Sequence, residues 1–226
     1  WVLGGWATAL LEAFRGPWAG VGPLPLNGNP GVGHSEIIWL MNHGPFAIAP
    51  ERGESTMIPG YNSSYRRDVL LAYGNRLAGL LSSENVLLAR LVADGHRLFL
   101  EPAARIAHLN EVDLRTMGRG YFLHNRVFGH RRAATFGWPW RKRLATALAF
   151  PLIPVYYLLR FSRVLSRRAP EYRPLLWRNA GFVLACQLCG AAGYALGLLL
   201  PLGGTEAAFT AYECTAPRPE ASPDHS

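Results

Sequence analysis

Three segments between Ile58 and His108 decide the fold class: IPGYNSSYRR at residues 58–67, LSSENVLLARL at 81–91 and GHRLFLEPAARIAH at 95–108. The first predicts a polar turn, because Pro-Gly favours turn geometry and glycine tolerates backbone angles that other residues avoid. The second carries apolar residues at helical spacing, which predicts an amphipathic helix with Glu84 near its start. The third contains a short apolar run at residues 97–100, which predicts a buried strand that Pro102 ends.

The flanking sequence predicts further regular structure. Apolar spacing and turn residues favour a helix within residues 1–14, a strand within 18–26, a turn-rich loop over 27–33, a helix around 37–41 and a long helix over 114–134.

In order and spacing, the three segments resemble family 2 glycosyltransferases, the inverting enzymes with a GT-A fold. The family pattern runs Pro-Gly-x-Asn-x-Ser-Tyr-Arg-Arg, a pair of acids, Leu-x-x-Arg-Leu, Gly-x-Arg and Pro-x-Ala-x-x-x-His, and nearly every part of it occurs here. The likeness covers most of residues 1–200. It implies an α/β fold, with the C-terminal, acceptor-side half of a GT-A domain at residues 1–135.

The same resemblance assigns roles to individual residues. Glu84 stands at the position of the catalytic base, which takes the proton of the acceptor hydroxyl, although Ser83 replaces the first acid of the family's pair. His108 falls where many GT-A enzymes place a histidine near the metal and the diphosphate. Arg126 alone matches the Gln-x-x-Arg-Trp motif of processive enzymes, so processivity is not inferred. The residues expected to bind substrate are Gly60, Tyr61, Asn62, Ser64, Arg66 and Arg126.

Each of these residues also has a structural alternative. Residues 61–67 could form an ordinary surface turn that leads into a helix. Glu84 could be a solvated first-turn carboxylate that the helix dipole favours. His108 could be a packed or surface histidine, and Arg126 a solvated or lipid-facing arginine. The order and spacing of the motifs together favour the functional interpretation.

One family motif is missing, because no Asp-x-Asp occurs in the sequence, which begins at Trp1 without a signal-peptide pattern. The resemblance therefore implies a fragment that lacks the N-terminal nucleotide-binding half. A divalent metal, Mg²⁺ or Mn²⁺, would be bound mainly by the missing Asp-x-Asp. The fragment alone is expected to have no transferase activity.

The composition is apolar and its charge is uneven. Hydrophobic residues make up 50% of the 226 residues and charged residues only 17%, against about 25% charged in a typical soluble domain. Residues 115–178 contain fourteen Arg or Lys and one acid, Glu171. Such a basic block suits nucleic acid or an anionic membrane, and the apolar runs within it favour the membrane. The three cysteines form neither a disulfide framework nor a metal site, and Cys186 and Cys189 are expected to be packing residues.

Residues 136–204 are predicted to be a membrane-associated helical region. Residues 138–143 have the aromatic and cationic composition of an interfacial anchor. The apolar run 144–159 contains two prolines and is too short for a straight span, so an interfacial or re-entrant segment is expected. Residues 160–178 form a basic connector, and residues 180–202 are long and apolar enough to span. The tail, 205–226, is expected to be disordered.

The leading interpretation is a membrane-associated hexosyltransferase of cell-envelope polysaccharide synthesis. It would transfer a sugar from a nucleotide-sugar donor to the hydroxyl of an unidentified acceptor, with inversion. The positive-inside rule places the catalytic part on the cytoplasmic face of the cell membrane. The alternative is a non-catalytic basic membrane-binding module. Nucleic-acid binding is the weakest hypothesis, because long apolar runs interrupt the basic residues.

Overall fold

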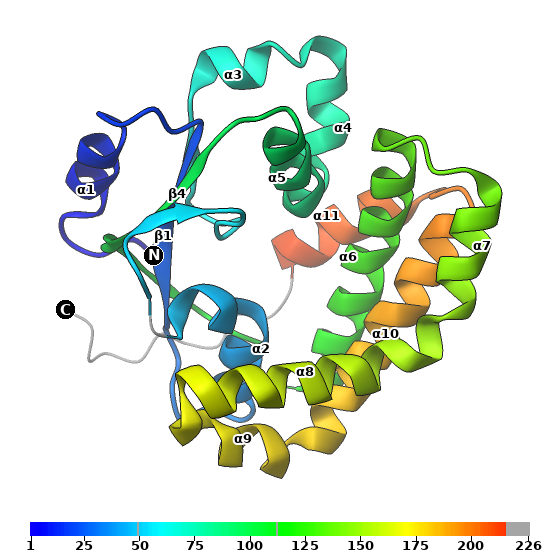
Figure 1. Cartoon of the computed structure of the whole chain (residues 1–226). Coiled ribbons are helices and arrows are strands. Elements are labelled where there is room, and N and C mark those ends of the chain that lie inside the picture. Colours follow the sequence, from blue (N-terminus) through cyan, green and yellow to red (C-terminus); the bar gives the residue numbers. More distant parts are fainter. Residues whose placement is uncertain (49, 112, 216–226) are drawn as a thin grey trace. The chain divides into compact units, whose positions relative to one another are not determined.

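A computed structural model of the chain describes residues 1–48, 50–111 and 113–215 (Figure 1). These residues form two compact units. Unit 1 contains Trp1–Gly31 and Ile38–Asn110, and unit 2 contains Val32–Ile37 and the described residues from Glu111 onward.

Unit 1 is built on a small mixed sheet, so the chain is α/β as predicted. Its strands are β1 (Gly20–Asn27), β2 (Gly53–Ser55), β3 (Ser64–Tyr65) and β4 (Leu98–His108), in the order β2-β4-β1-β3. The central pair, β1 and β4, is parallel, and both edge strands are antiparallel to their neighbours. The helical elements of this unit are α1 (Trp6–Ala13), α2 (Ser35–Ala47, whose first three residues belong to unit 2), α3 (Arg67–Leu71), η1 (Gly74–Arg76), α4 (Leu77–Leu81) and α5 (Glu84–Ala93).

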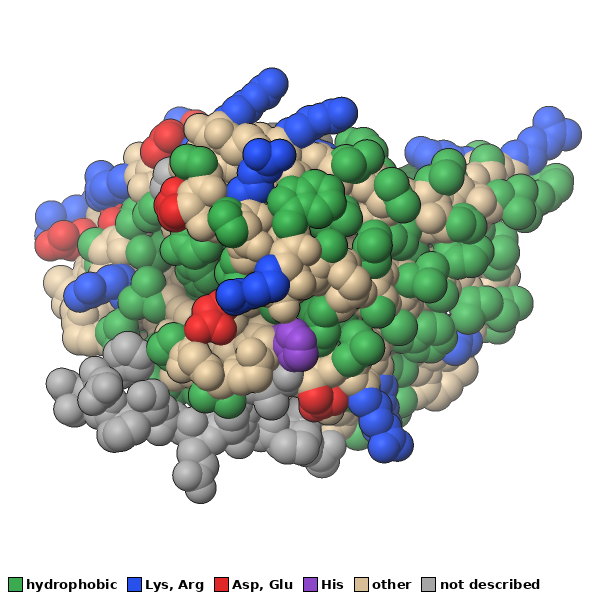
Figure 2. All heavy atoms as spheres, turned by 90° about the horizontal axis from the view of Figure 1, so that it is seen from below, with side chains coloured by type: hydrophobic (Ala, Val, Ile, Leu, Met, Phe, Trp, Pro, Cys, Tyr) green, Lys and Arg blue, Asp and Glu red, His purple; other side chains and the backbone are tan. Residues whose placement is uncertain are grey.

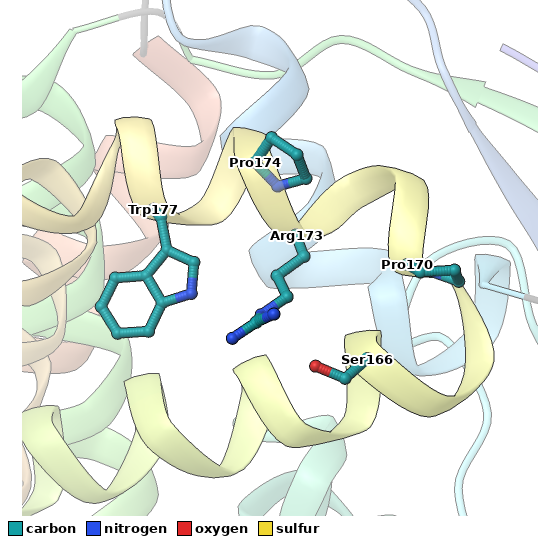
Figure 3. Close-up of a pocket in the computed structure, with 5 residues that line it drawn as sticks. All are labelled: Ser166, Pro170, Arg173, Pro174 and Trp177. Carbon is teal, nitrogen blue, oxygen red and sulfur yellow. The ribbon is translucent and has the colours of Figure 1, made fainter.

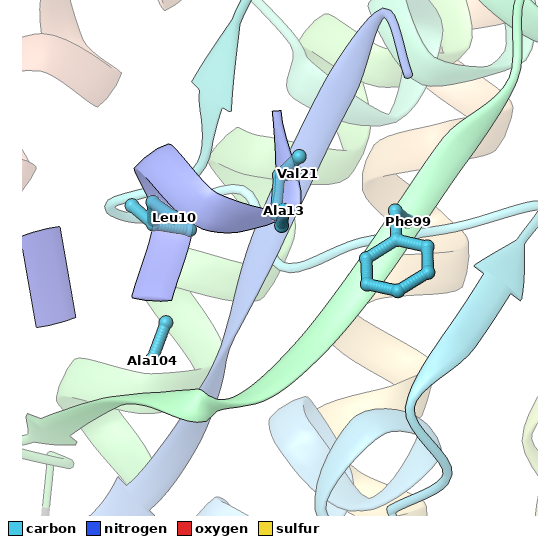
Figure 4. Close-up of a cluster of buried hydrophobic side chains, with 5 residues drawn as sticks. All are labelled: Leu10, Ala13, Val21, Phe99 and Ala104. Carbon is cyan, nitrogen blue, oxygen red and sulfur yellow. The ribbon is translucent and has the colours of Figure 1, made fainter. Parts of the chain in front are cut away.

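Apolar side chains hold α1 on this sheet and bury one face of α5. Leu10 and Ala13 of α1 pack against Val21, Phe99 and Ala104 of the central strands (Figure 4). The helix α5 begins at Glu84 as predicted, and it buries one apolar face. That face consists of Val86, Leu87, Leu88 and Leu91. Burial of such side chains contributes roughly 1.5–3 kcal/mol each. The spacing of the apolar residues therefore determines which face of α5 is buried.

The prediction that Pro102 ends a strand is wrong, because β4 continues to His108. The register with β1 pairs Pro23 with Glu101 and then Leu24 with Arg105, so residues 102–104 form a bulge. A proline has no N–H to donate to a neighbouring strand. A residue in a bulge does not have to make that hydrogen bond, so the strand can contain Pro102. The carboxylate of Glu101 supports the bulge, because it accepts a hydrogen bond from the Ala103 N–H at 3.1 Å.

Unit 2 is helical. Its elements are α6 (Leu114–Thr135), α7 (Trp140–Leu148), η2 (Phe150–Leu152), α8 (Ile153–Arg168), η3 (Pro170–Tyr172), α9 (Arg173–Arg178), α10 (Ala180–Leu199) and α11 (Thr205–Thr215). Of the described residues, only α10 forms a single helix long and apolar enough to cross a membrane. The pair formed by α7 and Phe150–Arg168 is bent by 42°. The prolines at 151 and 154 account for this break, which agrees with the prediction that the run is no straight span.

The basic connector, for which no secondary structure was predicted, is largely helical, since α8 extends to Arg168 and α9 follows it. The prediction of a disordered tail is wrong for its first part. Residues 205–215 of the predicted disordered tail form α11, and the rest of that tail lies outside the described residues. The helix is fixed by Glu206, which pairs with Arg131 at 2.6 Å, and by Tyr212, which donates to Glu111 at 2.9 Å. Such long-range contacts cannot be read from local composition.

Candidate functional site

The two parallel strands of unit 1 end together, and polar side chains collect there. Asn27 at the end of β1 is the register partner of His108 at the end of β4. Ligands of open α/β sheets bind outside the carboxyl ends of the strands. This edge is therefore the first place to look for a functional site.

An asparagine network fixes the backbone at this edge. The side chain of Asn29 accepts a hydrogen bond from the backbone N–H of Asn110 and donates one to its carbonyl, each at 2.9 Å. The Asn110 side chain donates to Asn27 Oδ1 at 2.9 Å, and its own Oδ1 lies 3.2 Å from His108 Nδ1. Asn29 and Asn110 are fully buried. Because each buried amide has a partner, the network holds the His108 ring in one place.

Three rings pack together beside this network. The His108 ring centroid lies 4.6 Å from that of His43, on α2, and 4.8 Å from that of Tyr61. His43 is fully buried, and neither of its ring nitrogens has a hydrogen-bond partner within the described residues. Burial, and the proximity of His108, lower the pKa of His43 to about 3. His43 is therefore a neutral imidazole at physiological pH, able to donate one hydrogen bond and accept another.

The predicted base lies against the predicted donor loop. A Cβ atom added to Gly60 would lie 3.2 Å from the carboxyl carbon of Glu84. A larger residue at position 60 would therefore displace this carboxylate. Tyr65 belongs to the same neighbourhood, because burial and the Glu84 charge both raise the pKa of its phenol. The buried Tyr65 hydroxyl has no hydrogen-bond partner among the residues that the structure describes.

The remaining loop residues shape the turn between Pro59 and β3. Asn62 has a φ of 55°, a left-handed conformation that asparagine tolerates better than most residues. The Ser63 hydroxyl donates a hydrogen bond to the carbonyl of Pro59. Ser64 begins β3 and pairs with Val21. Of the predicted substrate-binding residues, Asn62 and Ser64 thus have evident roles in holding the loop that carries Gly60 and Tyr61.

The two predicted substrate arginines are engaged elsewhere. The Arg66 guanidinium donates hydrogen bonds of 2.9–3.0 Å to the carbonyls of Phe14, Gly16 and Trp18, just after α1. These bonds satisfy carbonyls at the end of a helix, where arginine is favoured. Arg126 belongs to unit 2, and its Nη2 donates to the Pro201 carbonyl at 3.1 Å. None of these hydrogen bonds involves a residue of the ring cluster.

The ring cluster offers only some of the ligands that a divalent metal needs. His43 and His108 offer imidazole nitrogens, and the two nitrogens of His43 have no partner in the described structure. However, no group of three His, Cys, Asp or Glu side chains occurs within residues 1–48, 50–111 and 113–215. Mg²⁺ in particular prefers carboxylate and phosphate oxygens. The described residues therefore do not form a metal site by themselves.

Five residues of this site were not predicted from the sequence, namely Asn27, Asn29, His43, Tyr65 and Asn110. Asn27 and Asn29 were expected only as part of a turn-rich loop. His43 lies in an apolar helix, and no sequence motif around it marks it as a site residue. Tyr65 was part of the quoted loop but was not assigned a role. Asn110 stands two residues after His108, and this His-x-Asn spacing is the one local signal that could have revealed it.

No protein-family model, curated protein or solved structure matches this chain. The class that the structure itself defines is a mixed α/β unit with a polar site at the carboxyl edge of a parallel strand pair, joined in sequence to a helical unit.

Proposed function

We propose that unit 1 is the acceptor-side part of an inverting glycosyltransferase of the family 2 type. The proposal is supported chiefly by the approach of Gly60 to Glu84, which are 24 residues apart in sequence yet directly opposed in the structure. A donor-facing loop and a base have to meet in this way for a hydroxyl to be deprotonated beside a bound sugar. The same contact could also form between a surface turn and a helix start by packing alone, and Glu84→Gln separates the two cases.

In the proposed reaction, the Glu84 carboxylate takes the proton of the acceptor hydroxyl. The hydroxyl oxygen then attacks the anomeric carbon of the sugar, and the bond between that carbon and the nucleoside diphosphate breaks. The electron pair of this bond leaves with the diphosphate, and the configuration of the anomeric carbon inverts. A positioned base of this kind contributes roughly 10²–10⁴-fold to a rate.

The residues around Glu84 supply binding groups. The partnerless hydroxyl of Tyr65 and the partnerless nitrogens of His43 are buried polar atoms, and such atoms cost about 1–3 kcal/mol unless something satisfies them. A sugar or phosphate oxygen would satisfy them when substrate binds. Tyr61 is 41% exposed beside His108, so its ring offers a surface for a sugar to stack on.

A divalent metal, Mg²⁺ or Mn²⁺, remains part of the proposal as the group that neutralises the diphosphate. His108 and His43 are the residues of this chain that would face it. The other ligands would be oxygens of the diphosphate and carboxylates outside the described site.

The proposed location is the cytoplasmic face of the cell membrane. The excess of arginine over residues 115–178 supports it, because the anionic cytoplasmic leaflet attracts basic segments. The nucleotide-sugar donor would then come from the cytoplasm.

The test is an assay of the full-length gene product with a panel of nucleotide sugars, Mn²⁺ and a membrane extract as the source of acceptor. We expect release of nucleoside diphosphate with one donor, and a product whose anomeric configuration is opposite to that of the donor by NMR. A product with retained configuration would contradict the proposed mechanism. No release with any donor would count against the glycosyltransferase class itself.

A further inference from the structure

The apolar helix α10 is packed so closely against α6 that the two backbones touch. A Cβ at Gly193 would overlap the carbonyl of Phe122, and one at Gly197 would overlap the carbonyl of Arg126. The pairs advance in the same direction along both helices, so α6 and α10 run parallel. Glycine allows this close approach because it has no side chain.

The helix that packs most closely on α10 carries many cations. The helix α6 carries five arginines and two histidines, namely Arg115, Arg119, Arg126, Arg131, Arg132, His124 and His130. Beyond α10, the chain returns to α6 through α11, where Glu206 pairs with Arg131 and the ring of Phe209 lies 5.4 Å from that of His124. If α10 crossed a bilayer in this arrangement, several charged side chains of α6 would enter with it. Each arginine near the bilayer centre is strongly unfavourable.

A different part of unit 2 exposes apolar side chains. Between Leu148 and Leu159, the bent pair of α7 and α8 presents five large hydrophobic residues to solvent, with exposed fractions between 45% and 71%. They are Leu148, Leu152, Val155, Tyr156 and Leu159, which we call the apolar row. By contrast, the exposed residues of α10 are only Gly181, Leu188, Leu196 and Leu199. The apolar row is therefore the more accessible hydrophobic surface.

Cations border the apolar row on both sides in sequence. Arg141, Lys142 and Arg143 precede it, and Arg160, Arg163, Arg167 and Arg168 follow it. From residue 140 to residue 170 there is no Asp or Glu. On the face drawn in Figure 2, hydrophobic side chains gather at the right, and Lys and Arg side chains project at the margin. Apolar insertion beside headgroup-level cations is the pattern of a helix that lies in the plane of a membrane.

We propose that unit 2 attaches to an anionic lipid bilayer in the plane of the surface. The apolar row enters the boundary between headgroups and acyl chains, its flanking cations contact lipid phosphates, and α10 remains the packing partner of α6 without crossing the bilayer. Because residues 140–170 contain Arg and Lys but no Asp or Glu, the membrane surface that complements their charge is anionic. This attachment does not depend on the catalytic site proposed for unit 1.

A shallow hollow at the cationic end of α8 has room for a lipid headgroup. Its volume is about 350 Å³, and it is lined by Ser166, Pro170, Arg173, Pro174 and Trp177 (Figure 3). The indole of Trp177 donates a hydrogen bond to Ser162 at 3.1 Å, which holds α9 against α8. Arg173 offers a guanidinium at the hollow, a group suited to bidentate contact with a phosphate.

The experiment is flotation of the purified full chain with phosphatidylcholine vesicles, with and without phosphatidylglycerol. The double variant Leu152→Ser/Tyr156→Ser should lower binding at least tenfold, because it removes two inserted side chains. Arg160→Gln/Arg163→Gln should weaken binding to the anionic vesicles roughly 30-fold, with much less effect on neutral ones. Leu11→Ser is the matched control, since Leu11 in unit 1 is 72% exposed and Leu152 is 70% exposed. Its binding should equal that of the wild type.

Three outcomes would overturn the proposal. Wild-type binding by Leu152→Ser/Tyr156→Ser, with circular dichroism unchanged, would show that the apolar row does not insert. Retention of the wild type in cell membranes after alkaline carbonate extraction would show that α10 spans, whereas the in-plane attachment predicts release. A fall in self-association of the double variant without loss of flotation would instead identify a second copy of the chain as the occupant. None of these measurements uses transferase activity, so they are independent of the proposed reaction.

Discussion

Glu84 is the first residue of α5, where a carboxylate can serve either the helix or a reaction. The variant Glu84→Gln separates the two roles, because glutamine keeps the size and hydrogen bonding but cannot take a proton. We expect the turnover of the full-length protein to fall by roughly 10²–10⁴-fold. Donor affinity and melting temperature should stay near the wild-type values. The measurements are initial rates, donor titration and thermal unfolding.

Asp68 provides a matched control for this substitution. It is an exposed carboxylate in the first turn of α3, in the same unit and at a comparable helical position. Asp68→Asn should leave turnover unchanged. Equal and small effects of both substitutions would mean that Glu84 only stabilises its helix, and the base would then have to be sought elsewhere.

The lowered pKa of the buried His43 predicts how the folding stability depends on pH. Its pKa is about 3 in the folded protein, against 6.5 ordinarily, so between these values the unfolded chain binds a proton that the folded protein does not. Folding stability is therefore lost as pH falls from about 6.5 toward 3. Between pH 7 and pH 5 the loss due to His43 should be roughly 2 kcal/mol. Thermal unfolding of the wild type and of His43→Leu at both pH values measures it.

The comparison with His43→Leu removes the contribution of the carboxylates, which both proteins share. The wild type should lose more stability than the variant on acidification. Equal losses would show that the imidazole can be protonated in place, for example through a bound water.

At the scale of single residues, the sequence predicted the members of the site that belong to motifs. Glu84 and Gly60 were assigned to the site by their resemblance to family motifs, and the structure places them next to each other. His43 could not be predicted, because only the packing of α2 against the strand ends places it beside His108. Arg66 was predicted to contact substrate, yet its hydrogen bonds go to the backbone after α1. Local sequence does not reveal which carbonyls a long side chain will reach.

At the scale of elements, the packing of α10 on α6 is open to a direct test. Gly193→Ala places a methyl group against the Phe122 backbone, which cannot move away as a flexible side chain could. Overpacking of this kind costs about 1–3 kcal/mol. Gly181→Ala is the control on the same helix, because nothing lies within 4 Å of its added Cβ. It should stabilise by about 0.5–1 kcal/mol through helix propensity. Urea unfolding followed by circular dichroism should give shifts of opposite sign.

Predictions of elements succeeded where periodicity decided them and failed where distant contacts did. The starts of α5 and α6 agree with the predicted helices, since apolar spacing fixes both. Pro102 was expected to end β4, but the carboxylate of Glu101 and a bulge accommodate it. The helix α11 was predicted to be disordered because its composition is polar. Its ion pair with Arg131 provides stabilisation that composition does not show.

At the scale of the whole molecule, the same sequence feature supports two different modes of attachment. An apolar stretch of 20 residues predicts a span when it is considered alone. In the structure, that stretch is one side of a close glycine-mediated contact, and its partner helix is rich in arginine. Such a partner favours a core helix of unit 2 over a lipid-facing one. The two modes differ in where they place the chain beyond α10.

Cys214 can show on which side of the membrane the chain after α10 lies, and no engineered label is needed. It is exposed on α11, beyond α10, whereas Cys186 is fully buried. Cys189 is partly exposed, so the measurement is made in a Cys189→Ser background. If unit 2 lies on the cytoplasmic surface, Cys214 stays on that side. If α10 spans with its basic N-terminal flank in the cytoplasm, Cys214 emerges on the opposite side. We therefore expect a membrane-impermeant maleimide to label the protein only after cells are permeabilised, and Cys214→Ser to abolish this labelling. Labelling of intact cells would place α11 outside and would establish α10 as a transmembrane helix.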